Sequence, residues 1–140
     1  MNRILFATDG SDSAKAASRY VKSLLDAFAE CKLVVLTVKQ PMPMVEGFGF
    51  PGEPVIDLSN EPSEAIKESV EEDFAQYRDR MNFVSVTGHP AVTICEEAEN
   101  QHADLIVVGS HGRSAVDRLL LGSVSNGVVH RSKIPVLVVK

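Results

Sequence analysis

The 140-residue chain has only two cysteines and no apolar run long enough to cross a membrane. Cys31 and Cys95 lie in unrelated segments without C-x-x-C or zinc-ligand spacing, so neither a disulfide framework nor a cysteine metal site is expected. The first apolar run, Ile4 to Ala7, is too short for a signal peptide or a spanning helix. We therefore expect a cytoplasmic protein that makes no contact with a membrane.

Positive charge is also scarce. Lysine and arginine number 14 against 19 acidic residues, which gives a formal net charge of -5. A surface that neutralises many nucleic-acid phosphates needs a basic excess, so no nucleic-acid partner is expected. A small anionic ligand remains compatible with this charge, because a local group of backbone amides can act against the overall field.

Several catalytic motifs are absent. The chain has no G-x4-G-K-[ST] and no G-x-S-x-G, and no G-x-G-x-x-G that directly joins a predicted strand to a predicted helix. These absences exclude the hydrolytic machinery of P-loop enzymes and give little support for a dinucleotide site or a triad hydrolase. His89, His102 and His130 are scattered without partners at metal-ligand spacing, so each is predicted to be a surface or capping residue.

Apolar residues make up 44% of the chain and charged residues 24%, the balance typical of soluble globular proteins. The length suits one domain, which we expect to span residues 1–140. Five short apolar runs are predicted to be strands: Arg3–Thr8, Lys32–Val38, Asn82–Thr87, Asp104–Gly109 and Pro135–Val139. Four are nearly continuous in Val, Ile, Leu or Phe, as in parallel strands covered by helices on both faces. The third alternates and is predicted at an edge of the sheet.

Helical periodicity is found between these strands. Apolar residues recur at three- and four-residue steps over Ser13–Glu30, Glu61–Met81, Pro90–Gln101 and Ser123–Arg131. Regular alternation of strand and helix predicts an α/β fold, a doubly wound parallel sheet whose ligand crevice lies at the carboxyl ends of the strands. One connection, Lys39–Asn60, holds four prolines and three glycines and begins beside that crevice. It either covers a ligand or is a surface excursion without a role.

A glycine-rich passage follows the fourth strand. Gly109, Gly112 and Gly122 are spaced G-x2-G-x9-G-S, and Ser123 and Ser125 open the last helix. Glycine lets backbone amides approach a phosphate closely, and a helix N-terminus directs unpaired N–H groups at it. The passage predicts a nucleotide site, although ordinary strand-to-helix turns use the same residue types.

Two other strands end at the same edge and offer a carboxylate and a free strand-end backbone. Thr8 and Asp9 end the first strand, and Val38 ends the second. Asp9 either accepts a hydrogen bond from a base or helps to hold a hydrated metal ion, or it only forms a turn. His111 lies inside the glycine-rich loop, where it either touches a phosphate or has no ligand role.

With these motifs, the chain resembles the ATP-binding branch of the universal stress protein family. The resemblance covers nearly the whole length and is carried by residues 3–11, 103–114, 119–125 and 134–139. It implies a five-stranded parallel sheet ordered 3-2-1-4-5, with ATP lying across the ends of strands one, two and four. Ala7 stands where some ATP-binding relatives have proline beside the adenine.

The resemblance also assigns site residues. Asp9 and the backbone of Val38 would face adenine, Val108 and Gly109 would line base and ribose, and the glycine and helix-start positions would hold ribose and phosphates. The predicted cofactor-binding set is Ala7, Thr8, Asp9, Val38, Val108, Gly109, Ser110, His111, Gly112, Arg113, Gly122, Ser123, Val124 and Ser125. Mg2+ or Mn2+ would accompany the phosphates, and Arg113 or Arg118 would help to offset their charge.

Family members commonly dimerise through their last strands, and here Val136–Val139 is an apolar strand near the chain end. A homodimer, or a tetramer built from it, is therefore implied. Three functions remain open: a nucleotide-dependent stress or regulatory module, a slow ATPase or autophosphorylating protein that uses Ser110, Ser123 or Ser125, and a dimeric interaction module that binds no nucleotide. No catalytic residue is assigned.

Overall fold

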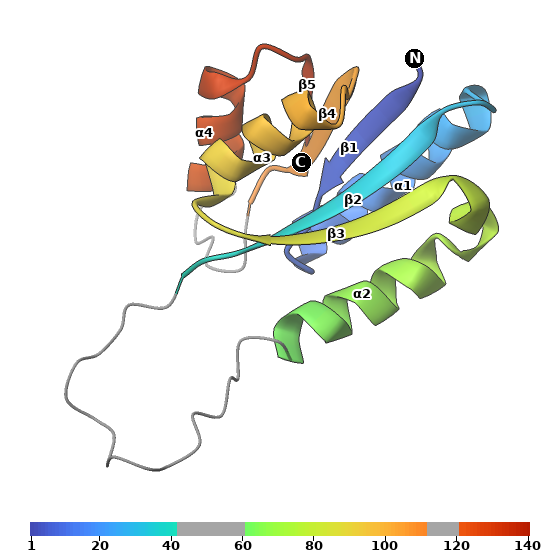
Figure 1. Ribbon diagram of the computed structural model, residues 1–140, viewed down its shortest axis with the longest axis horizontal. Coiled ribbons are helices and arrows are strands. Elements are labelled where there is room, and N and C mark those ends of the chain that lie inside the picture. The colour runs from blue at the N-terminus through green and yellow to red at the C-terminus, as the bar shows by residue number, and fades with distance from the viewer. Residues whose placement is uncertain (42–60, 112–120) are drawn as a thin grey trace.

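The computed structural model describes residues 1–41, 61–111 and 121–140. Its strands are β1 (Arg3–Ala7), β2 (Lys32–Lys39), β3 (Met81–Thr87), β4 (Leu105–Gly109) and β5 (Val136–Val139). Its helices are α1 (Asp12–Ala27), α2 (Glu61–Asp73), the short 3₁₀ helix η1 (Ala75–Arg80), α3 (Pro90–Asn100) and α4 (Ser123–Arg131). All strand pairs are parallel and the sheet order is β3-β2-β1-β4-β5, as predicted (Figure 1).

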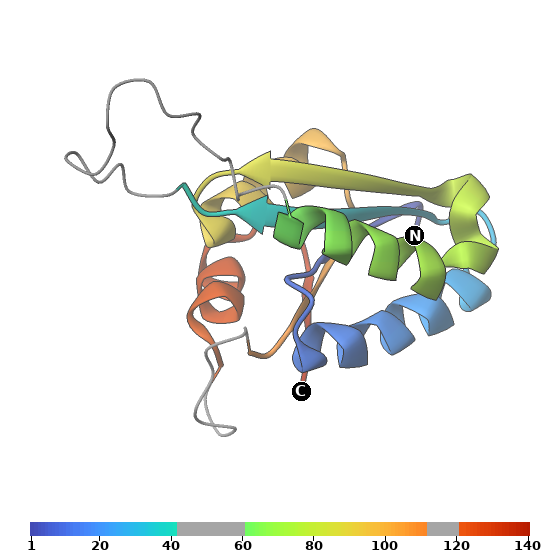
Figure 2. The ribbon, with the colours of Figure 1, turned by 90° about the horizontal axis from the view of Figure 1, so that it is seen from below.

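The central strand β1 is apolar on both faces because helices cover the sheet on both sides. Successive side chains of a strand point to opposite faces. Ile4 and Phe6 therefore pack in one core with α1 and α2, whereas Leu5 packs in a second core with α3 and α4. All three side chains are at most 1% exposed. Figures 1 and 2 show these two helical layers, with α1 and α2 side by side on one of them.

The alternating strand β3 lies at one edge of the sheet, which confirms its predicted position. The opposite edge is β5, which pairs with β4 and with no other strand in the described ranges. Both cysteines are buried free thiols, and burial raises the pKa of each. Within residues 1–41, 61–111 and 121–140, no helix is long and apolar enough to span a membrane.

The predicted helix Glu61–Met81 is wrong in its second half. Helix α2 ends at Asp73, η1 follows, and Met81 already belongs to β3. The amide of Tyr77 donates to the carbonyl of Phe74 at 2.8 Å, a three-residue step that tightens the backbone. This pitch turns Tyr77 towards α1, where its hydroxyl donates to Asp26 Oδ1 at 2.7 Å. Burial, and then this hydrogen bond, raises the pKa of Tyr77.

The first helix also ends earlier than predicted, at Ala27 instead of Glu30. The amide of Phe28 still donates to Leu24, but the backbone of Phe28 has left the helical region with φ -119° and ψ 85°. The amide of Cys31 then donates to the carbonyl of Phe28 at 2.9 Å, which closes a tight turn into β2. The chain therefore reaches β2 without a further helical turn.

Candidate functional site

A cavity of about 170 Å³ opens at the carboxyl edge of the sheet, where the alternation of strands and helices predicts a ligand crevice. It lies beyond the ends of β1, β2 and β4, between the starts of α1, α3 and α4. Its lining residues are Ala7, Thr8, Asp9, Ser11, Ala14, Leu36, Val38, Gln40, Pro90, Ile94, Val108, Gly109, His111, Val124 and Ser125.

The cavity brings together most of the predicted binding set. The members that line it are Ala7, Thr8, Asp9, Val38, Val108, Gly109, His111, Val124 and Ser125. Ser110, Gly122 and Ser123 are described but lie outside its lining, and Gly112, Arg113 and Arg118 fall outside the described residues. Contact of any of these residues with a ligand remains a prediction.

Six lining residues were not predicted: Ser11, Ala14, Leu36, Gln40, Pro90 and Ile94. Two of them carried a usable signal. Leu36 shares a strand face with Val38, because residues two apart in a strand point the same way. Ile94 belongs to the inward stripe of α3, which begins directly after β3. The others depend on how the start of α1, the start of α3 and the end of β2 approach one another, which a single sequence does not reveal.

The cavity has an apolar body and a polar end. Leu36, Val38, Ile94, Val108 and Val124 supply aliphatic walls that fit a flat heterocycle. The polar side chains come chiefly from the turn after β1 and from the loop after β4. An apolar slot with a few polar groups at one end is the usual form of a small-molecule site.

The turn after β1 depends on two side chains. Asp9 Oδ1 accepts a hydrogen bond from the amide of Ser11 at 2.9 Å, and Thr8 Oγ1 accepts one from the amide of Gly10 at 3.2 Å. Gly10 has φ 76°, a left-handed conformation that favours glycine. Asp9 therefore forms the turn, which was one of its three predicted roles, while it also lines the cavity.

Ser110 connects the loop to two other elements. It is 2% exposed, and its amide donates to the carbonyl of Val139 in β5 at 2.8 Å. Its own carbonyl accepts from the amide of Gly122 at 2.7 Å and from Ser125 Oγ at 2.9 Å. These contacts hold the end of β4 against the end of β5 and the start of α4. The hydroxyl of Ser125 also lies 3.0 Å from the carbonyl of Gly122, so both of its contacts are to backbone carbonyls.

His111 has one satisfied and one unsatisfied ring nitrogen. Its Nδ1 lies 2.8 Å from Ser110 Oγ, and its amide donates to Ser13 Oγ at 3.3 Å. The Nε2 atom is buried and has no hydrogen-bond partner within the described ranges. An unpaired buried polar atom is unfavourable, so His111 Nε2 is a position where a further partner would stabilise the loop.

Helix α4 begins beside the cavity with an open N-terminus. Its N-cap is Gly122, which has no side chain to accept from the first amides of the helix. Val124 and Ser125 of the first turn line the cavity. Free amides and the helix dipole favour an anion at this position. The described residues contain no group of three or more His, Cys, Asp or Glu side chains that could hold a metal ion.

A family model described as the universal stress protein family matches residues 1–140. The chain is 33% identical to universal stress protein MJ0531 of Methanocaldococcus jannaschii over 99% of its own length and 81% of the relative's. It is 35% identical to a universal stress protein of Thermus aquaticus over 98% and 97%.

Two solved structures agree with these matches. Protein MJ0577 superposes with a TM-score of 0.82 and 31% identity, covering 99% of this chain and 95% of the other. A universal stress protein in complex with cAMP superposes with a TM-score of 0.72 and 30% identity, covering 99% and 97%. The chain is therefore similar to the two relatives in sequence and to the two solved structures in fold, over most of the length of each.

Proposed function

Because the chain belongs to the universal stress protein family, we propose that it is a nucleotide-dependent regulatory module whose carboxyl-edge cavity binds ATP. One observation carries this proposal: an apolar slot lies directly beside the open N-terminus of α4. The slot suits a base and the helix amides suit phosphates. A relative that is 30% identical forms a complex with cAMP, an adenine nucleotide.

The proposed pose follows the shape of the cavity. Adenine would lie between Leu36, Val38, Ile94 and Val108, with the carboxylate of Asp9 near its amino group. The volume of 170 Å³ is below the roughly 300–1,000 Å³ of usual ligand pockets, so the described walls would hold base and ribose only. The phosphates would then extend towards the first turn of α4.

The charge of ATP needs local compensation in an acidic chain. The amides at the start of α4 supply part of it, and His111 Nε2 offers a further hydrogen-bonding atom near the loop. A divalent cation, Mg2+ or Mn2+, would arrive with the phosphates and neutralise part of their charge. The proposal assigns no protein ligand to that ion.

Phosphoryl transfer to serine is the second candidate, and one contact favours it. His111 Nδ1 lies 2.8 Å from Ser110 Oγ, the arrangement that a base needs beside a hydroxyl nucleophile. Burial opposes it, because Ser110 and Ser125 are each only 2% exposed. Mass analysis after incubation with Mg-ATP separates the two functions, since only the second adds a phosphate to the chain.

Nucleotide binding itself is tested by mass spectrometry of the gently isolated protein. Co-purified ATP or ADP in near-stoichiometric amount would support the proposal. A protein that is isolated without nucleotide and also fails to bind added Mg-ATP would contradict it. The remaining function would then be an interaction module that keeps the fold without the ligand.

Replacement of Gly122 by valine is expected to weaken ATP binding at least tenfold, about 1.4 kcal/mol. The side chain would stand where phosphate oxygens approach the first amides of α4. Gly122 has φ -63° and ψ 162°, an extended conformation that valine also adopts, so the fold should persist. Calorimetric titration measures the affinity and circular dichroism checks the fold. Unchanged affinity in a folded variant would remove this helix start from the site.

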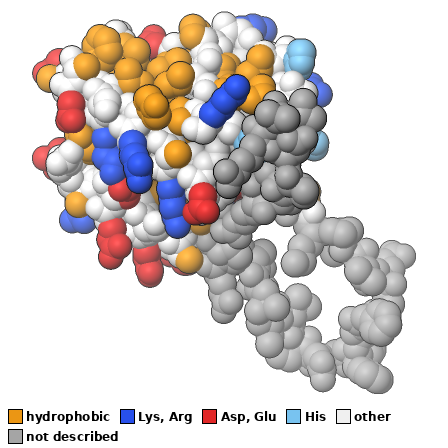
Figure 3. Space-filling view, turned by 180° about the vertical axis from the view of Figure 1, so that it is seen from behind, with side chains coloured by type: hydrophobic (Ala, Val, Ile, Leu, Met, Phe, Trp, Pro, Cys, Tyr) orange, Lys and Arg blue, Asp and Glu red, His pale blue; other side chains and the backbone are white. Residues whose placement is uncertain are grey.

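We also propose a homodimer through antiparallel pairing of β5 with its copy. Val136, Leu137 and Val138 are only partly buried in the single chain, and the outer hydrogen-bonding edge of β5 pairs with no described strand. Figure 3 views the molecule from behind and shows hydrophobic side chains gathered over the upper part of this side. Exposed apolar edge strands favour pairing with another chain. Sedimentation at micromolar concentration should give the mass of two chains, and a one-chain mass would contradict the dimer.

A further inference from the structure

A second and larger hollow lies on the other side of β1, between α1 and α2. The two helices run side by side and diverge towards the carboxyl edge of the sheet (Figure 2). The groove that they leave has a volume of about 450 Å³. It is lined by Phe6, Thr8, Gly10, Ala14, Lys15, Ser18, Arg19, Lys22, Ile66, Ser69, Val70, Glu72, Asp73 and Phe74.

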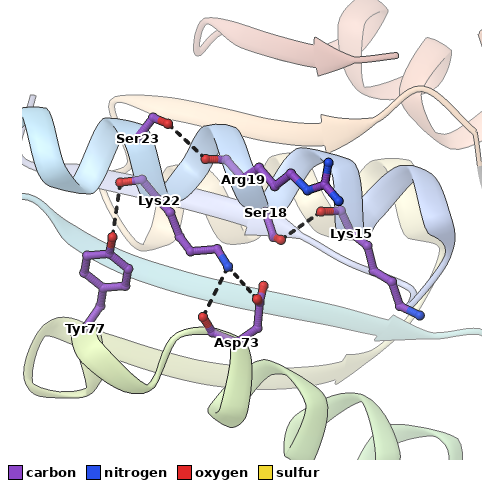
Figure 4. A network of polar contacts seen from close by, with 7 residues as sticks. All are labelled: Lys15, Ser18, Arg19, Lys22, Ser23, Asp73 and Tyr77. Carbon is purple, nitrogen blue, oxygen red and sulfur yellow. Dashed lines mark hydrogen bonds and ion pairs between the residues drawn. The ribbon is translucent and has the colours of Figure 1, made fainter.

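The narrow end of the groove is closed by contacts between the helices. Lys22 Nζ lies 2.5 Å from Asp73 Oδ1 and 5.5 Å from the centre of the Phe74 ring, so this cation is already paired (Figure 4). The hydroxyl of Tyr77 contacts the carbonyl of Lys22 and donates to Asp26. These contacts fix the separation of α1 and α2 at one end and leave the other end open.

Two cations on the open part of the groove have no such partner. Lys15 and Arg19 are four residues apart on α1, so they project from the same side of the helix. Both are exposed, and neither side chain has an ion pair or hydrogen bond to a described residue. Figure 4 marks contacts to the backbone carbonyls of both residues and none to their charged groups. Basic side chains also gather near the middle of the side shown in Figure 3.

The floor of the groove is apolar. Phe6 and Phe74 are each 1% exposed with ring centres 6.1 Å apart, and Val70 is also buried. Ile66 is only half-buried, and it lies on the wall that faces α1. An aliphatic or aromatic group placed between the helices would cover Ile66 and remove apolar surface from water.

The charges of the rim restrict the ligand further. A guanidinium and an ammonium group suit a carboxylate or a phosphate, which the guanidinium can contact with two N–H groups. Glu72 on the opposite wall would repel a second anionic group, whereas the charge of Asp73 is offset by Lys22. The groove therefore suits one anionic group on an apolar body better than a polyphosphate.

We propose that this groove is a second ligand site, which binds an organic anion with one carboxylate or phosphate group and an aliphatic or aromatic body. Its volume falls within the roughly 300–1,000 Å³ that small-molecule sites occupy. Lys15 and Arg19 hold the anionic group, and Ile66 with the aromatic floor holds the body. The proposal does not depend on ATP binding, although Thr8 and Ala14 line both cavities.

Calorimetric and NMR titrations with octanoate, octyl phosphate and octanol test the site. At least one of the two anions should bind saturably, and octanol should bind at least tenfold more weakly. The comparison of octanoate with octyl phosphate identifies the preferred head group. Amide shifts should concentrate at Ser18 and Ser69, and saturating Mg-ATP should not displace the anion. Displacement by Mg-ATP, or shifts around Val108 and Val124 instead, would overturn the proposal.

Variants distinguish binding in this groove from nonspecific attraction of anions to basic side chains. The double change Lys15→Gln and Arg19→Gln should weaken anion binding at least tenfold. The matched double change Arg131→Gln and Lys133→Gln removes the same charge at the end of α4 and should leave anion binding unaltered. Ser69→Trp should also abolish binding, because it fills the groove without changing charge.

Equal loss in both double variants would overturn the proposal, as would binding of octanol as tight as that of the anions. An absence of saturable binding by octanoate and octyl phosphate, together with binding of an acidic peptide, would assign the groove to a protein partner instead. Each of these outcomes leaves the ATP measurements unaffected, so failure of this site and failure of the nucleotide site can be distinguished.

Discussion

A Gly109→Ala variant is expected to lose about 3 kcal/mol of folding free energy, because the end of β4 touches the first turn of α1. A methyl group at Gly109 would lie 2.6 Å from Ser13 Oγ, 2.8 Å from the carbonyl carbon of Ser13 and 2.9 Å from the amide nitrogen of Ala14. Ordinary contacts between nonbonded heavy atoms are about 3.5–4.0 Å. Either α1 or the loop must therefore move.

Movement of α1 would disturb its N-cap. Ser11 Oγ accepts from the amide of Ala14 at 3.3 Å, the same amide that the new methyl group would approach. Overpacking costs about 1–3 kcal/mol, and loss of a cap adds about 1 kcal/mol. Urea denaturation with an unchanged m-value measures the combined loss. The cavity should change as well, because Ser11, Ala14 and Gly109 all line it.

The serine hydroxyl supplies a control for this prediction. Ser13→Ala alone should have a small effect, because the hydrogen bonds of Ser13 Oγ are long, at 3.3 to 3.5 Å. Ser13→Ala combined with Gly109→Ala should not restore stability, since the two backbone contacts remain. A double variant as stable as the parent would show that only the hydroxyl opposes the methyl group. A Gly109→Ala protein within about 0.5 kcal/mol of the parent would contradict the close packing altogether.

Parallel strands and their ends could be predicted because local sequence determines them. β1 and β4 carry near-continuous apolar side chains since both faces of each are covered, and β3 alternates because it lies at an edge. The order of the strands could not be predicted in this way, because the strand pattern alone does not distinguish one doubly wound order from another. It was implied by the resemblance to the family and is confirmed by the structure.

The interruption after α2 could not be predicted from apolar periodicity. Phe74, Tyr77 and Arg80 are three residues apart, a spacing that fits either an α-helix or a 3₁₀ helix. The choice is made by tertiary contacts, since Tyr77 and Arg80 both hydrogen-bond to residues of α1 or of the turn after it. Those partners lie about fifty positions earlier in the chain, beyond the reach of a local pattern.

The site was predicted best where strands end and least well where the loop folds back. Thr8 and Val38 follow from strand termini and Val108 from the resemblance to the family, and all three line the cavity. The inward position of Ser110 does not, because it depends on simultaneous contacts with β5 and α4. The backbone of Ser110 holds three elements together, and its contact with a ligand stays a prediction.

Arg80 is expected to contribute about 3 kcal/mol to folding stability, although it lies far from the cavity. Its Nη1 donates to the carbonyl oxygens of Phe28 at 3.0 Å, Ala29 at 2.6 Å and Cys31 at 3.3 Å. Its Nη2 donates to the carbonyl oxygen of Leu25 at 2.9 Å. The last carbonyls of a helix have no partner within the helix, and α1 has no basic residue in its last turn. Arg80 supplies both the donors and the positive charge that this terminus lacks.

An Arg80→Met variant keeps the long apolar stem and removes all four hydrogen bonds, which come from two guanidinium nitrogens. Hydrogen bonds to a charged group contribute about 1.5–3 kcal/mol each, but water can reach some of the exposed carbonyls, so the total should be near 3 kcal/mol. The guanidinium carbon also lies 5.3 Å from the centre of the Tyr77 ring, and that contact is lost with the charge. Urea denaturation of the variant and the parent under the same conditions measures the difference.

Arg78 provides the matched control, because it lies on the same short helix, is exposed, and has no hydrogen bond or ion pair to a described residue. Arg78→Met removes the same charge and should change stability by less than about 0.5 kcal/mol. Arg80→Lys should recover part of the loss, since an ammonium group reaches some of the carbonyls but cannot span them as a planar guanidinium does. Equal effects of the changes at Arg78 and Arg80 would mean that net charge, and not the cap on α1, determines the stability.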